Sequence, residues 1–157
     1  MIPVKQTRLY RGKLPHERGN CYPAVIASIM EIGCDEVIQF QELYDECWLD
    51  PLNQWLEARG WELESADDFK AFHDQLWIHR FLETDGKNPD GLPGEQWREL
   101  TCDWLQDEYY FVGAQSPRDP DVYHICIYQN GAMVHDPHPD GTGILTEQTF
   151  VRLKRID

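Results

Sequence analysis

The chain has 157 residues, 41% of them hydrophobic and 12% aromatic, so it suits one folded domain with a real core. This composition excludes global disorder. Asp and Glu number 28 against 14 Lys and Arg, which gives a formal net charge of −14. Because so acidic a surface repels phosphate backbones, we expect no nucleic-acid partner.

The charge is unevenly distributed along the chain. Residues 1–20 carry five cations and one acid, whereas residues 31–121 carry six cations and 23 acids. The acidic middle is typical of a solvated face that aids solubility. The alternative is a polyanion mimic that engages a basic partner.

The Cys residues and the apolar segments of the sequence indicate in which cellular compartment to expect the protein. The five Cys residues form no Cys-x-x-Cys pair, and no charged-then-apolar leader precedes them. We therefore expect reduced thiols in a cytoplasmic protein. The apolar stretch 24–32 is interrupted by Ser28 and Glu31 and is far shorter than the ~20 residues of a membrane span, so we expect no membrane association.

The N-terminal part of the chain reads as helical. The stretch 20–33 predicts a helix with Asn20 as its N-cap, Pro23 in its first turn and Gly33 as its C′ residue. Almost no polar face remains on it, so it should be buried on most sides. A second helix is predicted near Asp35. Further helices are expected over 50–60, 67–83 and 94–106, with a short strand over 61–64 and a turn-rich segment over 85–94.

After residue 107 the pattern changes from helix to strand. β-branched and aromatic runs predict strands over 109–112, 122–128, 132–136 and 150–154, with a loop over 136–143. Helices followed by an antiparallel sheet give an α+β fold, and we expect a single domain over residues 1–157.

Three residues in this arrangement suit nucleophilic catalysis. Cys21 directly follows the expected cap, where free N–H groups and the helix dipole favour thiolate over thiol. His124, on a strand, is the candidate base, and Asp136, on the next strand, is the candidate residue that orients its imidazole. The backbone amide of Cys21 is a candidate donor to an oxyanion.

At these residues the chain resembles the papain-like cysteine peptidase superfamily, and most closely small bacterial and phage proteins allied to its C39-like members. The resemblance covers about half of the chain, and its matching stretches are 3–7, 19–28, 109–118, 123–126 and 130–143. It implies a papain-like core in which a central N-terminal helix packs on an antiparallel sheet. It also implies Cys21 as nucleophile, His124 as base, Asp136 as orienting residue and Gln6 as the oxyanion-hole glutamine. Residues 62–107 lie outside the resemblance and are interpreted as a helical elaboration.

The expected activity is that of a cysteine peptidase or amidase-like hydrolase without a cofactor. It would cleave an amide bond of a protein, peptide or other substrate through an acyl-enzyme, and deamidase or acyltransferase outcomes stay open. Ser116, Arg118 and Arg11 are candidate substrate contacts. The alternative function is a catalytically inactive papain-like protein, or an acidic inhibitor, that binds a basic partner.

A metal site is the other role that the residue types around His124 would allow. His124, Cys126, His135, Asp136 and His138 offer ligand atoms of the types zinc accepts, but their spacing matches no established motif, so we predict no metal. Cys34, Cys47 and Cys102 read as buried thiols. The six Trp residues, at positions 48, 55, 61, 77, 97 and 104, read as core or cleft wall.

The hairpin at Asn130-Gly131 decides whether His124 and Asp136 can meet. A two-residue type I′ turn, which Asn-Gly favours locally, pairs Ile125 with Asp136 and turns the carboxylate away from the histidine. A three-residue loop with Gly131 in the left-handed position sets His124 opposite Asp136. The catalytic arrangement requires that register or a bulge that restores it, and we predict the three-residue loop.

Overall fold

A computed structural model describes residues 1–43, 49–85, 103–105 and 107–157. Its α-helices and strands are α1 (Cys21–Met30), α2 (Leu49–Glu57), β1 (Trp61–Ser65), α3 (Phe69–Asp85), β2 (Tyr110–Gln115), β3 (Tyr123–Gln129), β4 (Ala132–His135) and β5 (Thr149–Arg155). Its short 3-10 turns are η1 (Pro15–Glu17), η2 (Cys34–Glu36), η3 (Phe40–Glu42) and η4 (Asp103–Leu105).

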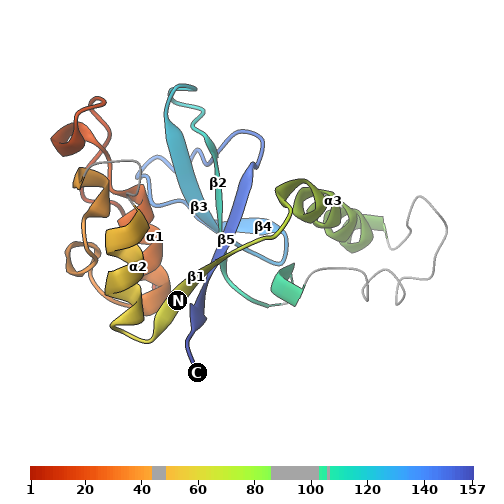
Figure 1. The fold of residues 1–157 in the computed structure, drawn as a ribbon. Helices are drawn as coiled ribbons and strands as arrows, with labels where there is room; N and C mark the ends of the chain where they lie inside the picture. The colour runs from red at the N-terminus through yellow and green to blue at the C-terminus, as the bar shows by residue number, and fades with distance from the viewer. Residues whose placement is uncertain (44–48, 86–102, 106) are drawn as a thin grey trace.

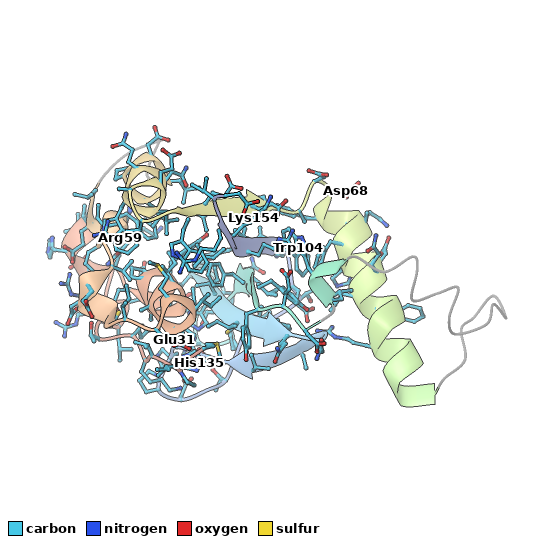
Figure 2. The ribbon with its side chains drawn as sticks, turned by 90° about the horizontal axis from the view of Figure 1, so that it is seen from below. Glu31, Arg59, Asp68, Trp104, His135 and Lys154 are labelled. Atoms are coloured by element: carbon cyan, nitrogen blue, oxygen red, sulfur yellow. The ribbon has the colours of Figure 1, made fainter. Side chains whose placement is uncertain are left out.

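The five strands form one antiparallel sheet in the order β1-β5-β2-β3-β4. Helices α1 and α2 lie on one face of this sheet and α3 lies on the other (Figures 1 and 2). The predicted combination of helices with an antiparallel sheet is therefore confirmed. The strand predicted over 61–64 is β1, which pairs with β5 from Trp61 to Ser65 and forms an edge of the sheet.

Alternation along the strands explains why both faces carry helices. In β3, Ile125 and Ile127 pack into the cluster that contains α1 and α2, whereas Cys126 and Tyr128 pack into the cluster that contains α3. Neighbouring side chains point to opposite faces of a strand, so an uninterrupted apolar run needs a cover on both sides. The run predicted over 122–128 is such a strand.

Helix α1 is the centre of the larger cluster, and residues 23–28 are all buried. Both expected end signals differ from those observed. The Asn20 side chain makes no cap hydrogen bond, because it is fully buried and bonded elsewhere. The left-handed position at the C-terminus belongs to Glu31, at φ 59°, and not to Gly33, since the helix ends two residues earlier than its apolar pattern.

The other helical predictions have mixed outcomes. The helices expected over 50–60 and 67–83 are present as α2 and α3. Near Asp35 the chain forms only the 3-10 turns η2 and η3, so the helix predicted there is wrong. Of the predicted helix over 94–106, only 103–105 are described, as η4, and the turn-rich segment predicted over 85–94 lies outside the described residues except for residue 85.

Some of the predictions for Cys and Trp residues are confirmed, one is wrong, and others lie outside the described residues. Cys34 is buried, at 4% exposure, whereas Cys47 and Cys102 lie outside the described residues, as do Trp48 and Trp97. Trp104 is a core residue, but Trp77 is 53% exposed and lines neither the core nor the pocket described below.

The β3–β4 turn has two residues, not three. Gln129 pairs with Ala132, and Asn130 and Gly131 both have positive φ, at 49° and 78°, as a type I′ turn requires. The predicted three-residue loop is therefore wrong.

A β-bulge one pair further along returns Asp136 to the face of the sheet from which the two-residue turn would remove it. Tyr128 pairs with Met133, but the next residue, Ile127, pairs with His135. Val134 is thus the extra residue on β4, with no partner of its own. The bulge moves everything after it by one position, so Asp136 does not turn away from the face of β3 that carries Cys126.

Within the described residues, none of the helices combines the length and apolar character that a membrane crossing requires.

Candidate active site

Cys21 is the first residue of α1, and its side chain is partly exposed. The first N–H groups of a helix have no carbonyl four residues back, so the amide of Cys21 points out of the helix end. Cys21 lines a cavity of about 960 Å³ between α1, the N-terminal segment and the start of β3. A nucleophile here is reachable from solvent and lies at the positive end of a buried helix.

His124 and Asp136 form a buried hydrogen-bonded pair. The Nε2 atom of His124 lies 2.7 Å from Oδ1 of Asp136, and the residues are 5% and 4% exposed. The same Oδ1 accepts the backbone N–H of His138 at 2.8 Å, and Oδ2 accepts that of Gly143 at 2.7 Å. Three hydrogen bonds therefore hold the carboxylate in place.

Gly143 is a position where only glycine fits easily. Its φ is +77°, a conformation that L side chains rarely adopt, and a Cβ there would lie 3.2 Å from Sδ of Met133. This backbone conformation brings the Gly143 N–H to the Asp136 carboxylate. The glycine thus contributes to the position of the acid.

The charges of this pair are strongly stabilised. Burial lowers the pKa of His124, but hydrogen bonds with Asp136, Cys126 and Cys21 outweigh burial and raise that pKa from 6.5 to about 11. Burial raises the pKa of Asp136, and the bonds from His124, His138 and Gly143 reverse this and lower it to about 2. Near neutral pH the pair is therefore an imidazolium and a carboxylate.

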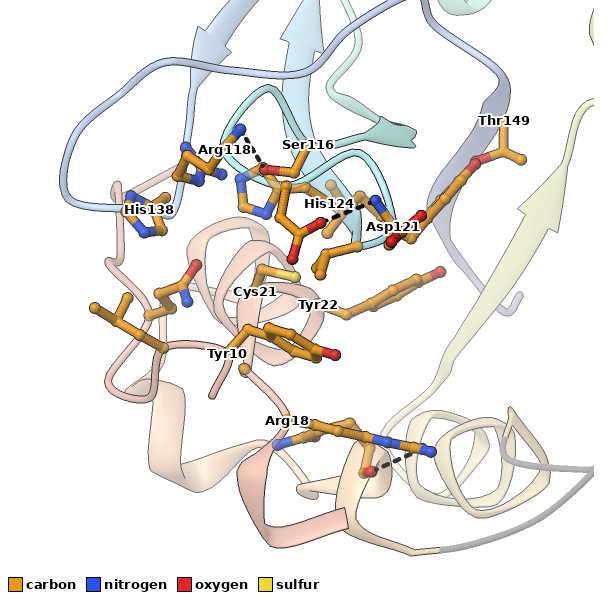
Figure 3. A pocket seen from close by; sticks show the side chains of 18 of the residues that line it. Tyr10, Arg18, Cys21, Tyr22, Ser116, Arg118, Asp121, His124, His138 and Thr149 are labelled. Atoms are coloured by element: carbon orange, nitrogen blue, oxygen red, sulfur yellow. Dashed lines mark hydrogen bonds between the residues drawn. The ribbon is translucent and has the colours of Figure 1, made fainter. Parts of the chain in front are cut away.

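His124 and Cys21 line the same pocket, and the nearby Cys21 side chain is one of the causes of the raised pKa of His124. Because Nε2 is bonded to Asp136, Nδ1 is the ring nitrogen left for a cysteine. Figure 3 shows Cys21 in the pocket wall between His124 and Tyr10. Cys21 therefore lies at a helix N-terminus in the same pocket as a charged imidazole.

Gln6 also lines this pocket and is 9% exposed. Its Nε2 atom donates to the carbonyl of Arg8 at 2.8 Å, and its Oε1 atom is buried without a hydrogen-bond partner among the described residues. An amide nitrogen carries two hydrogens, so one of them remains for a further acceptor. Gln6 thus lies in the pocket wall, and its role as an oxyanion donor stays a prediction from the resemblance.

The N-terminal segment that carries Gln6 is held on two sides. On the α1 side, the N–H groups of Ile2 and Val4 donate to the backbone carbonyl and the hydroxyl of Ser28. On the other side, the N–H of Gln6 donates to the carbonyl of Pro137 at 3.0 Å, and Nζ of Lys5 donates to the carbonyl of Asp136 at 2.8 Å. The segment therefore connects the nucleophile's helix to the acid's loop.

Asn20 ties the same segment to the start of α1. Its Oδ1 accepts the N–H of Arg8 at 2.8 Å, and its Nδ2 donates to Thr7 at 2.9 Å and to Cys34 Sγ at 3.3 Å. Gly19 allows the close approach, because a Cβ there would lie 3.0 Å from the Tyr10 nitrogen. Asn20, expected as a cap, instead fixes the segment across the helix end.

The expected substrate contacts have different environments. Ser116 and Arg118 line the pocket, whereas Arg11 does not. Arg118 donates to Asp140 at 2.7 Å and to Thr142 at 2.5 Å, and its Nη1 lies 3.8 Å from Oδ2 of Asp136. Arg118 thus joins the β2–β3 loop to the loop after β4, behind the His124–Asp136 pair.

The sequence analysis named Cys126 only as a possible metal ligand, and the structure places its thiol beside the His124–Asp136 pair. Its thiol is fully buried, and ligand atoms of His124, Cys126 and Asp136 lie within 4.8 Å of one another. One nitrogen, one sulfur and one oxygen are ligand types that zinc accepts. Both oxygens of Asp136 already accept hydrogen bonds, however, so this trio is first of all a hydrogen-bonded cluster. The two-residue spacing from His124 on one strand was the available signal.

Comparisons of the chain with models of known families, with curated proteins and with solved structures gave no match.

Proposed function

We propose that this protein is a papain-like thiol hydrolase that cleaves an amide or peptide bond through an acyl-enzyme on Cys21. The observation that carries the proposal is the buried His124–Asp136 pair, with Nε2 and Oδ1 2.7 Å apart, whose histidine lines one pocket with a cysteine at the N-terminus of a buried helix. A thiol, an imidazole and a carboxylate that orients the imidazole are the groups that covalent acyl transfer requires, and their placement around one pocket supports the proposal.

In the first step the Cys21 thiolate attacks the substrate carbonyl carbon, and the carbonyl π electrons move to the oxygen. The amide of Cys21 and the second hydrogen of Gln6 Nε2 are the candidate donors to that oxyanion. As the carbonyl re-forms, the C–N bond breaks and the leaving nitrogen takes the proton of the His124 imidazolium. The products are a thioester on Cys21, a free amine and a neutral imidazole.

In the second step the neutral His124 accepts a proton from water while the water oxygen attacks the thioester carbonyl. The C–S bond breaks, the carboxylic acid leaves, and the thiolate–imidazolium state is restored. Asp136 keeps the imidazole in one orientation and stabilises its charged form throughout. If an amine replaces water as acceptor, the same apparatus is an acyltransferase.

Selective alkylation tests this proposal. Limiting iodoacetamide near neutral pH should modify Cys21 well before the buried thiols Cys34 and Cys126, as measured by peptide mapping. Because helix-dipole stabilisation supplies only about 0.3–1 kcal/mol at an exposed end, His124→Ala should slow the reaction at Cys21 strongly. An activated p-nitrophenyl ester should then leave an acyl group on Cys21 that is detectable by intact mass.

Equal modification of Cys21 and Cys34 in the native protein would refute the nucleophile assignment. So would an amide-cleaving activity that Cys21→Ala leaves intact.

A further inference from the structure

The wall of the pocket carries exposed apolar side chains that nothing in the catalytic steps uses. Four large side chains with exposed fractions of 45%, 38%, 38% and 49% line it, and they are Leu9, Tyr10, Phe69 and Tyr123. They come from the N-terminal segment, the start of α3 and the start of β3. We call these four residues the apolar wall. An exposed apolar cluster in a concavity is typical of a surface that a ligand covers.

Two features indicate that this wall is built and not incidental. The hydroxyl of Tyr123 bonds to Thr149 Oγ1 at 2.9 Å, and a Cβ on Gly113 would lie 2.7 Å from the Tyr123 ring, so a glycine makes room for the ring. Phe69 packs edge-on against the buried Phe150 at 6.3 Å between ring centroids. The rings of Tyr123 and Phe69 are therefore held in place before any ligand arrives.

Charge does not offer an equally strong basis for recognition. Apart from the catalytic residues, the pocket is lined by two acids, Asp119 and Asp121, and by three Lys or Arg side chains, so these charges nearly balance. Arg118 is bonded to Asp140 and Thr142, and Arg18 donates to the carbonyl of Gln41 at 3.4 Å. The strongly acidic character of the chain as a whole is thus not reproduced beside Cys21.

We infer that the substrate of this site carries a bulky apolar side chain, aromatic or large aliphatic, next to the bond that Cys21 attacks, and that the apolar wall binds it. This inference rests on the proposed function and adds the class of substrate. The occupant is a peptide segment with such a residue, because a cavity of about 960 Å³ has room for more than one side chain.

Matched alkylating agents test the inference without knowledge of the natural substrate. N-(2-phenylethyl)iodoacetamide and N-(2-hydroxyethyl)iodoacetamide have the same reactive group and differ in an apolar or polar tail. We expect the phenylethyl reagent to modify Cys21 at least about tenfold faster, after each rate is divided by its rate with glutathione, because the phenyl group leaves water for the wall. Mass spectrometry of the Cys21 peptide gives both rates.

Two leucines provide matched variants. Leu9 in the wall and Leu145 outside the pocket are 45% and 44% exposed, so replacing either one removes little buried packing. Leu9→Asp should reduce the phenylethyl preference at least about threefold, whereas Leu145→Asp should leave the preference unchanged.

The outcomes separate the two proposals. If plain iodoacetamide does not select Cys21, the proposed function fails. If it selects Cys21 but the two tailed reagents react equally, or if Leu9→Asp and Leu145→Asp behave alike, the apolar substrate class is overturned while the nucleophile stands.

Discussion

Nε2 of His124 lies 2.7 Å from Oδ1 of Asp136, although the two residues are not opposite each other across the hairpin. Continuing the pairing of Ile127 with His135 places Asp136 opposite Cys126, two residues along β3 from His124. The two members of the pair are therefore diagonal neighbours on one face, a separation that polar side chains of this length can bridge. The buried thiol of Cys126 fills the position directly opposite the acid.

This geometry makes an unusual prediction for Val134. Deleting this bulge residue lets Met133 and His135 follow each other, and Tyr128 and Ile127 then keep the same partners in a regular hairpin. We expect the deletion variant to keep the His124–Asp136 bond and more than about a tenth of the Cys21 alkylation rate. The downfield imidazole proton resonance of His124 is the direct measurement. Deleting Val134 and His135 together, which places Asp136 opposite Ile127 on the other face, should abolish both signals.

Stability of the pair should depend on pH in two directions. Burial lowers the pKa of His124, but Asp136, Cys126 and Cys21 raise it more, to about 11. The charged imidazole therefore stabilises the folded state fully below pH 6.5, and this stabilisation is lost as pH rises towards 11. Burial raises the pKa of Asp136, but its hydrogen bonds lower it more, to about 2. The Asp136 carboxylate therefore stabilises the folded state above pH 3.8, and this stabilisation is lost as pH falls towards 2. Wild type and Asp136→Asn should therefore differ most in free energy of unfolding between about pH 4 and 6.5.

Urea unfolding at pH 3, 5.5 and 9 measures this difference. Above pH 6.5 it should shrink by up to about 1.4 kcal/mol per pH unit. The exposed Asp119, whose carboxylate accepts only the N–H of Asp121 among the hydrogen bonds described, supplies the control variant Asp119→Asn. A difference for Asp136→Asn that stays constant from pH 5.5 to 9 would contradict a charged pair.

Gln6→Ala separates binding of the oxyanion from formation of the thiolate. Loss of one oxyanion donor typically lowers turnover by about 10²–10³, and we expect that loss for this variant. Its iodoacetamide rate at Cys21 should stay within about threefold of wild type, because alkylation develops no oxyanion. Both rates are measured on the same preparation. A parallel fall in the two rates would make Gln6 a structural residue of the N-terminal segment.

Two glycines of one loop distinguish backbone strain from loss of the Asp136 contact. Gly141 and Gly143 both have positive φ, at 66° and 77°, so alanine at either position should cost about 1–2 kcal/mol of stability. Only Gly143 donates to Asp136, and only its Cβ would meet Met133. Gly143→Ala should therefore slow Cys21 alkylation several-fold at equal folded fraction, while Gly141→Ala should not. Equal rates would remove Gly143 from the support of the acid.

The sequence predicted the sheet and the position of Cys21 well, because period-2 and helical patterns reflect burial directly. The strand runs of β2, β3 and β5 and the buried helix α1 are long and strongly apolar. The end signals of α1 were less informative. Asn20 is buried for a tertiary reason, its bonds to Thr7 and Arg8, and local cap preferences cannot anticipate such partners.

The hairpin shows a different limit of sequence reasoning. Asn130-Gly131 by itself predicts a two-residue turn, whereas a His124–Asp136 pair predicts a three-residue loop. The structure has both the two-residue turn and the His124–Asp136 hydrogen bond, because Val134 is an extra residue that forms a bulge on β4. A bulge depends on cross-strand packing and has no sequence signal as strong as Asn-Gly. The carboxylate's other donors, the N–H groups of His138 and Gly143, follow from the same loop conformation.

Because the N-terminal segment is hydrogen-bonded both to α1 and to the loop after β4, several parts of the site depend on this one segment. The segment bonds to Ser28 of α1 on one side and, through Lys5 and Gln6, to the carbonyls of Asp136 and Pro137 on the other. Local unfolding of these few residues would remove the Gln6 donor and release the acid's loop in one event, with the core of the sheet intact. We therefore expect reactivity at Cys21 to decline at lower urea concentrations than the circular dichroism of the helices, and the amide of Gln6 to exchange its hydrogen sooner than that of Cys126.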